Sequence, residues 1–179
     1  MKKIKLFFVT MLMLILTTAC SLGSTPTSAV ERLFASYNNN DEEIMVELDD
    51  YVNTSSLSDE QNKKYKEVYL KQFRDLKYEI KEEVIDGDSA TVTTQITVYD
   101  YYKAEKDANN YLTTNSDEFM TDGEYDESKF TDYKLKELDK VNTTVDYTID
   151  FTLTKVDNEW VVNELTNEQL EKIHGVYEY

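Results

Sequence analysis

The sequence is poor in the residues that metal sites and many catalytic sites require. Its 179 residues include one cysteine, one histidine, one proline and four glycines. A single cysteine excludes an internal disulfide and the cysteine-rich zinc and iron–sulfur sites. A single histidine, His174, leaves no histidine pair for a metal and argues against a Ser-His-Asp triad. We therefore expect no cofactor.

Basic residues are also scarce. The chain has 36 Asp and Glu against 19 Lys and Arg, which gives a formal net charge of −17. This balance argues against nucleic acid or an anionic lipid surface as partner, because phosphate groups are bound by Lys and Arg. The chain also has no glycine-rich phosphate loop, and its length indicates one domain rather than two.

The N-terminus has the features of an export signal. Three lysines within residues 2–5 precede an apolar run over residues 6–16, which is too short to cross a bilayer as a helix. Small residues at 17–19 then lead into the lone Cys20. This arrangement resembles the lipobox of bacterial lipoproteins, although Thr17 stands where an aliphatic residue is usual.

The resemblance implies a signal peptide over residues 1–19, cleaved before Cys20, and a diacylglycerol on the Cys20 sulfur. Each buried CH₂ group contributes roughly 0.8 kcal/mol, so two acyl chains suffice for stable anchoring. The mature protein would then lie on the extracytoplasmic face of the cell membrane, with residues 20–25 as the lipidated cysteine and a short linker. The alternative is an ordinary cleaved signal followed by an incidental cysteine.

Three helices are predicted after this linker. Ser24 or Thr25 can cap the first, with Pro26 in its first turn, and acidic residues at 41–43 favour a second helix start. Ser58 to Gln61 is a capping-box pattern that begins the third. The apolar stripes are Val30, Leu33, Phe34 and Tyr37 in the first helix, Ile44, Met45, Leu48 and Val52 in the second, and Tyr65, Val68, Tyr69, Phe73 and Leu76 in the third.

Strand patterns dominate the rest of the chain. Residues 78–84 and 90–98 flank an Asp86-Gly87-Asp88 hairpin turn, and residues 145–153 alternate strictly between apolar and polar side chains. A last strand is predicted over residues 160–165, followed by a short helix that begins after Thr166. The polar, acidic segment 103–134 is expected to be a long loop insertion with at most a helical turn.

Helices followed by a meander of long strands indicate an α+β fold. The order is similar to the cone-shaped nuclear transport factor 2-like fold, in the version found in small Gram-positive lipoproteins of unknown function. The similarity rests on three segments, PTSAVERLFASYNNND, YEIKEEVIDGDSATVTTQITVYD and VDYTIDFTLTKVDNEWVVNEL. It implies one domain over residues 26–179, with the N-terminal helices packed in a curled antiparallel sheet.

In this fold the sheet and helices often enclose a pocket. Tyr65, Tyr69, Tyr78, Tyr147 and Trp160 could line such a pocket. Ketosteroid-isomerase-like members place an acidic base and a tyrosine in such a cavity. No Asp or Glu interrupts the inward positions of residues 90–98 or 145–153. A packed core therefore explains these residues better than a catalytic site, and we expect no enzymatic activity.

Two further features have two interpretations each, and a third, His174, has one. Tyr99, Tyr101 and Tyr102 could form a recognition surface, but ordinary packing at a strand end is preferred. The acidic residues between Asp117 and Glu127 could bind Ca²⁺, but Lys129 falls where an EF-hand requires a bidentate glutamate, so a solvated loop is preferred. His174 is interpreted as a helix-end residue whose cation suits the helix dipole.

These observations favour a lipid-anchored extracytoplasmic binding domain without catalysis. Besides the membrane, reached through the Cys20 lipid, its expected partner is an envelope protein, a wall component or a small ligand. The alternative is a small-ligand carrier or an isomerase-like enzyme that uses the cone pocket. An open cavity lined by tyrosine and an acid would favour this alternative. The sequence leaves the oligomeric state open.

Overall fold

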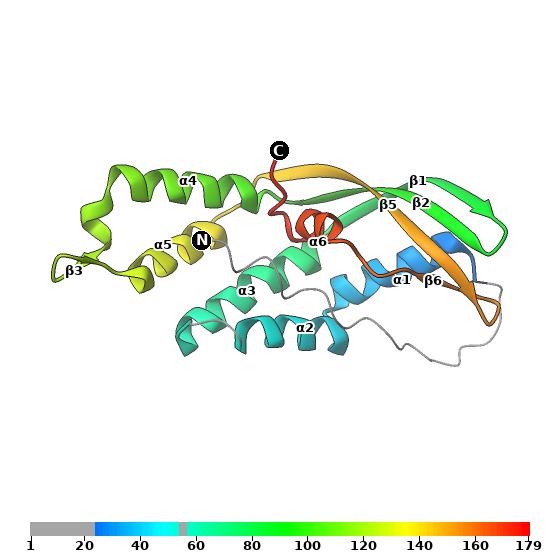
Figure 1. Cartoon of the computed structure of the whole chain (residues 1–179), viewed down its shortest axis with the longest axis horizontal. Helices are drawn as coiled ribbons and strands as arrows, with labels where there is room; N and C mark the ends of the chain where they lie inside the picture. Colours follow the sequence, from blue (N-terminus) through cyan, green and yellow to red (C-terminus); the bar gives the residue numbers. More distant parts are fainter. Residues whose placement is uncertain (1–23, 54–56) are drawn as a thin grey trace.

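The computed structural model describes residues 24–53 and 57–179, so the expected signal peptide and Cys20 lie outside the described residues. Within them, six α-helices and a four-stranded antiparallel sheet form the predicted α+β fold (Figure 1). The helices are α1 (Pro26–Asn39), α2 (Glu42–Asn53), α3 (Asp59–Asp75), α4 (Tyr101–Thr114), α5 (Glu127–Asp139) and α6 (Asn167–His174). The strands of the main sheet are β1 (Lys77–Asp86), β2 (Ser89–Tyr99), β5 (Thr144–Val156) and β6 (Glu159–Val162), the last ending before the predicted Leu165.

Side-chain caps begin the helices where the sequence predicts. In α1, α3 and α6 the capping hydroxyl accepts a hydrogen bond from a backbone N–H one turn ahead, and a side chain from that turn reaches back to the cap. Such reciprocal bonds satisfy backbone N–H groups that have no partner inside the helix. The three boxes pair Thr25 with Ser28, Ser58 with Gln61, and Thr166 with Gln169.

The main sheet is ordered β1-β2-β5-β6, and the long β2–β5 pair runs in continuous register from Ser89 opposite Thr154 to Tyr99 opposite Thr144. The inward residues of β2 are all buried, as the alternation predicts. On the outer face, the hydroxyls of Thr93 and Thr97 each donate a hydrogen bond of 2.6 Å to an aspartate of β5. The sheet is not closed, and the cone shape stays a prediction.

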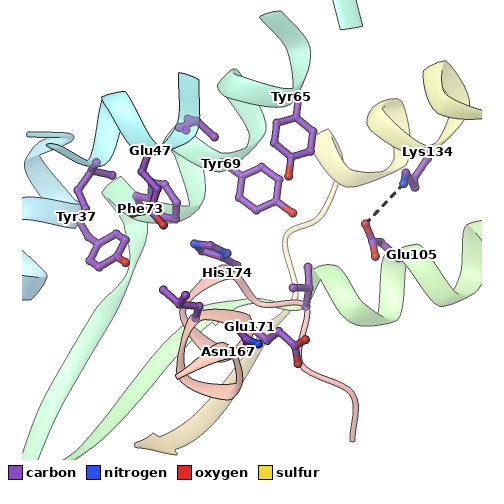
Figure 2. A pocket seen from close by; sticks show the side chains of 14 residues that line it. Tyr37, Glu47, Tyr65, Tyr69, Phe73, Glu105, Lys134, Asn167, Glu171 and His174 are labelled. Carbon is purple, nitrogen blue, oxygen red and sulfur yellow. Dashed lines mark ion pairs between the residues drawn. The ribbon is translucent and has the colours of Figure 1, made fainter. Parts of the chain in front are cut away.

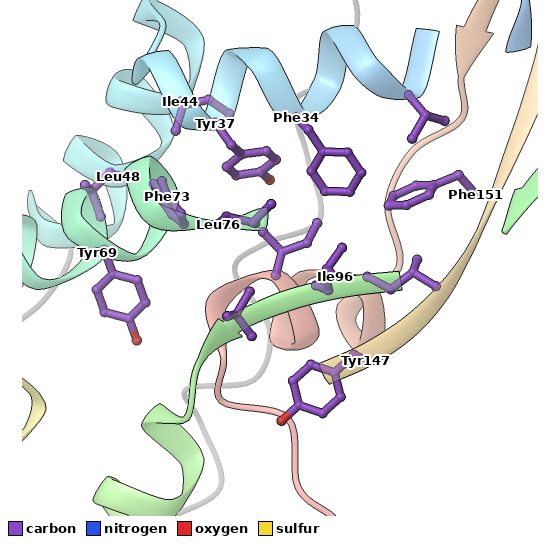
Figure 3. Packing of buried hydrophobic residues seen from close by; sticks show 14 of the residues in the cluster. Phe34, Tyr37, Ile44, Leu48, Tyr69, Phe73, Leu76, Ile96, Tyr147 and Phe151 are labelled. Atoms are coloured by element: carbon purple, nitrogen blue, oxygen red, sulfur yellow. The ribbon is translucent and has the colours of Figure 1, made fainter. Parts of the chain in front are cut away.

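The inner face of the sheet is covered by α1, which contacts β1, β2 and β6. Phe34 of α1, Ile96 of β2 and Phe151 of β5 are all fully buried (Figure 3). The Phe34 ring stacks on Tyr78 at 4.6 Å between centroids and meets Phe151 edge-on at 5.5 Å. Side chains therefore fill the space between α1 and the sheet, as the packed-core interpretation predicts for the inward positions.

Residues 103–134 are not the long loop that the sequence analysis expects. They lie mostly in α4 and α5, which pack together and are joined by a 3₁₀ turn (Ser116–Phe119) and two short strands, β3 (Met120–Thr121) and β4 (Glu124–Tyr125). Asp100 and Asp126 cap the two helices by accepting backbone hydrogen bonds. The residues that the hairpin buries are Tyr101 and Ala108 of α4, Phe119 of the turn, and Leu135 and Leu138 of α5.

Candidate functional site

A cavity of about 360 Å³ opens among the helices, away from the filled sheet interior (Figure 2). Its wall is built by the end of α1, by α2 and α3, by α4 and α5, and by α6 with the residues that follow it. The volume lies near the lower end of the range found for small-molecule sites. The cavity is therefore large enough for a small organic molecule.

Aromatic rings form a continuous wall of the cavity. Tyr37 of α1 meets Phe73 edge-on at 5.1 Å between centroids, Phe73 is 6.2 Å from Tyr69, and Tyr69 stacks on Tyr65 at 4.5 Å. Residues 65, 69 and 73 are spaced by four along α3, so one face of that helix presents all three rings. Tyr65 and Tyr69 thus both line a pocket, which lies between helices.

Contacts between α3 and α5 hold this wall in place. Gln61, the capping-box residue of α3, is buried, and its Nε2 donates hydrogen bonds to the backbone and hydroxyl oxygens of Ser128 and to Asp132. On the opposite side, Lys134 of α5 pairs with Glu105 of α4 at 3.9 Å, and each of these side chains is about one-third exposed. The helical hairpin thereby forms one side of the pocket.

Glu47 supplies an acid that the sequence analysis did not identify. It lies on α2 between Ile44 and Leu48, which both line the pocket, and its side chain is half-buried. Burial raises the pKa of the Glu47 carboxyl. The pKa of the nearby Tyr37 is also raised, first by burial and then by the Glu47 charge. The sequence signal that could have identified this acid is its position, because a glutamate three residues after Ile44 falls within the apolar stripe of the predicted second helix.

His174 differs from the sequence-based interpretation. Its ring packs against Tyr69 at 5.7 Å and Phe73 at 5.4 Å between centroids. Burial lowers the pKa of His174 to about 4, so the imidazole is neutral at pH 7. The prediction that His174 is a cation at the end of α6 is therefore wrong. A helix dipole typically stabilises a cation by about 0.3–1 kcal/mol, which is less than the free-energy penalty of charging a ring in this environment.

Three of the predicted lining residues lie elsewhere. Tyr78 packs on the core through Phe34, while Tyr147 and Trp160 are buried in or beside the sheet. The Tyr147 hydroxyl donates a hydrogen bond to the backbone oxygen of Tyr177, and burial raises the pKa of Tyr147 to about 12. Tyr147 and Trp160 thus belong to the packed core that the preferred interpretation predicts, and the cavity of the alternative interpretation lies between helices.

The aromatic cluster at the end of β2 is divided among three environments. Tyr101 is fully buried and its hydroxyl donates to the backbone oxygen of Val68, as the packing interpretation predicts. Tyr99 is half-buried, with its hydroxyl on Asp75, and Tyr102 donates to Glu178. The three tyrosines therefore do not form one recognition surface.

Two of the acidic residues considered for Ca²⁺ have other partners. Glu118 accepts hydrogen bonds from the Tyr111 hydroxyl, and Asp126 both caps α5 and accepts from Thr121. In the described stretches, no three His, Cys, Asp or Glu side chains gather closely enough to hold a metal ion.

Across residues 24–53 and 57–179, no helix combines the length and apolarity needed to cross a bilayer.

Comparisons with known proteins give one weak likeness. No protein-family model matches the chain, and no curated protein is detectably similar to it. Its structure is similar to that of a candidate lipoprotein from Bacillus subtilis, with 16% sequence identity and a TM-score of 0.42. The similarity covers 84% of this chain and 47% of that one, so the chain spans about half the length of that structure. A likeness of this strength assigns no activity.

Proposed function

We propose that this protein is a lipid-anchored extracytoplasmic binding protein that holds a small ligand in the pocket between its helices. The observation that carries the proposal is the contrast between two regions of the molecule. The inner face of the sheet is filled by side chains, whereas the helices leave a cavity of about 360 Å³ with tyrosine rings and a half-buried carboxylate on its wall. Apolar walls with few polar groups are typical of small-molecule sites.

The position of Ser24, the first residue that the structure describes, supports a lipid anchor on Cys20. The backbone N–H of Trp160 donates a hydrogen bond of 3.1 Å to the Ser24 hydroxyl, which holds Ser24 beside β6. Three residues lie between Cys20 and Ser24, so the four Cα-to-Cα steps limit the distance between their Cα atoms to about 14 Å. Helix α1 then carries the chain about 17 Å from Pro26 to Tyr37 at the pocket. A lipid on Cys20 would thus attach the protein at the end of α1 that lies beside β6, with the pocket at the other end of that helix.

Native mass spectrometry of the protein extracted from its own membrane tests the ligand proposal. We expect a reproducible mass beyond that of the lipidated chain. Leu48→Trp places an indole in the pocket and should remove this mass, whereas Val46→Trp, on the exposed face of the same helix, should keep it. Thermal unfolding checks that both variants are folded. A chain that carries the lipid alone would refute a stably bound ligand and would favour an envelope protein or wall component, to be sought by crosslinking.

The anchor is tested separately. Replacing Cys20 by Ala removes the proposed site of lipid attachment while leaving the described fold unchanged. We expect the variant to leave the membrane fraction and the native mass to lose the diacylglycerol. Unchanged membrane retention of Cys20→Ala would contradict the lipid anchor.

An isomerase-like enzyme is the second candidate, and one observation favours it. The pocket combines a carboxyl of raised pKa, Glu47, with tyrosine rings, a pairing suited to proton transfer next to a carbonyl. The test measures deuterium exchange at the carbon next to the carbonyl of a small ketone such as phenylacetone. If the protein binds without catalysis, the exchange rate with the protein equals the rate in buffer alone. Faster exchange that is lost in Glu47→Gln would establish the enzyme instead.

A further inference from the structure

The charges on the pocket wall leave an excess of negative charge. Glu105 and Lys134 compensate each other in their ion pair, and His174, with a pKa of about 4, is neutral at pH 7. Among the lining residues that the structure describes, the remaining charged groups are Glu47 and Glu171. The electrostatic environment therefore favours a cation over an anion or a neutral molecule.

Glu47 is one of two lining carboxylates without a counter-charge, the other being Glu171, and it lies beside Tyr37 of the ring wall. Among the described residues, no Lys or Arg pairs with it, whereas other acidic groups such as Asp49 of the same helix have a lysine partner. Its pKa is raised because burial disfavours the charged form. A cation bound beside Glu47 would supply the missing counter-charge and offset this cost. A neutral ligand would leave the cost in place.

The rest of the wall fits the body of an organic cation. Tyr37, Tyr65, Tyr69 and Phe73 offer apolar contact, and aromatic rings also attract ammonium groups. A bare metal ion would find too few oxygen ligands here, since such ions require several. The combination of one partly buried carboxylate with an aromatic wall matches a molecule that has one positive charge and an apolar body.

We propose that the pocket binds a small organic ammonium compound, with its positive charge beside Glu47 and its apolar body against the tyrosine rings. The inference rests on the proposed function and names the chemical class of the ligand. Glu47 is the residue that contributes most to the selection for charge, and the ring wall contributes most of the apolar contact.

Three probes with one body and different charges test the proposal at pH 7. These are 2-phenylethylamine, which is protonated, 2-phenylethanol, which is neutral, and phenylacetate, which is an anion. Isothermal titration calorimetry of the full chain in a non-ionic detergent measures each affinity. We expect the amine to bind at least tenfold more tightly than the alcohol, and phenylacetate to bind more weakly than both.

Two variants assign the preference to one residue. Glu47→Gln should lower the affinity for the amine about tenfold, to the level of the alcohol, and leave the affinity for the alcohol unchanged. Glu43→Gln is the matched control, because it removes the same charge from the exposed first turn of α2 and should change neither affinity more than twofold. An equal loss in both variants would refute a specific role for Glu47.

The remaining outcomes separate this inference from the proposed function. If 2-phenylethanol or phenylacetate binds as tightly as the amine, the pocket stands and the charge selection is overturned. If the amine shows no binding at millimolar concentration, the ammonium assignment is overturned. In that case a ligand mass that survives extraction and disappears in Leu48→Trp would still uphold the proposed function.

Discussion

The titration of His174 offers a direct test of how its surroundings are packed. It is the only histidine of the chain, so its Cε1–H signal in the NMR spectrum of the untagged protein needs no assignment among several. Burial between Tyr69 and Phe73 lowers its pKa from 6.5 to about 4. We expect the signal to stay in its neutral position from pH 7 down to pH 5 and to move only below that.

The same shift predicts how stability depends on pH. Between pH 6.5 and 4 the unfolded chain binds a proton at His174 that the folded chain does not, so the free energy of unfolding falls as pH falls. The contribution of His174 to stability is present above pH 6.5 and is lost on acidification. The loss amounts to about 2 kcal/mol by pH 5 and about 3 kcal/mol by pH 4.

The assay compares the wild type with His174→Phe in urea at pH 7 and pH 5, above the isoelectric point of about 4.4. The variant keeps an aromatic ring in place and cannot titrate. Glu47, whose raised pKa acts in the opposite direction, remains in both proteins and cancels in the comparison. The wild type should lose about 2 kcal/mol more than the variant. Parallel losses, or a His174 pKa near 6.5, would refute the packing argument.

Three further substitutions test the core and the framework around the pocket. Phe34→Ala removes a fully buried ring and should cost about 3–5 kcal/mol in urea unfolding, and a cost below about 1 kcal/mol would contradict the packing against Phe151. The Gln72 side-chain amide pairs with both the backbone N–H and the backbone oxygen of Tyr99, and Gln72→Leu removes both hydrogen bonds. Thermal unfolding should therefore show a loss of stability of about 2–4 kcal/mol, and Gln72→Glu, which keeps an acceptor for the N–H, should lose less. Gly175→Ala should cost about 1–3 kcal/mol, because this residue has a φ of +73° and an added Cβ would meet the Tyr99 oxygen, while the exposed Gly87→Ala should lack the clash component.

Local signals predicted most of the elements. The three capping boxes begin helices as expected because a hydroxyl and a nearby polar side chain act within one turn. The alternation of β2 and β5 predicted their buried faces because side chains on a strand point to opposite sides. The helical hairpin of α4 and α5 was missed because its polar, acidic composition is also typical of a loop.

The candidate site could be predicted only in part. Tyr65 and Tyr69 were named as possible lining residues of a pocket that the fold resemblance implies, and they line the pocket between the helices. Tyr78, Tyr147 and Trp160 were named with them, but a packed core was preferred, and α1 fills the space under the sheet with Phe34 and its neighbours. Glu47 was not predicted because the positions that indicated a pocket acid lie on strands, whereas Glu47 lies on α2.

The sequence by itself determined the α+β class, the starts of α1, α2, α3 and α6, the strand faces and the excess of negative charge. These depend on residues close together in the chain or on composition alone. The tertiary structure decided where the cavity lies, because a cavity is the space left when α2, α3, α4, α5 and α6 pack imperfectly against one another. It also decided that His174 is neutral and that Glu47 lacks a counter-charge, since desolvation depends on neighbours that are distant in sequence.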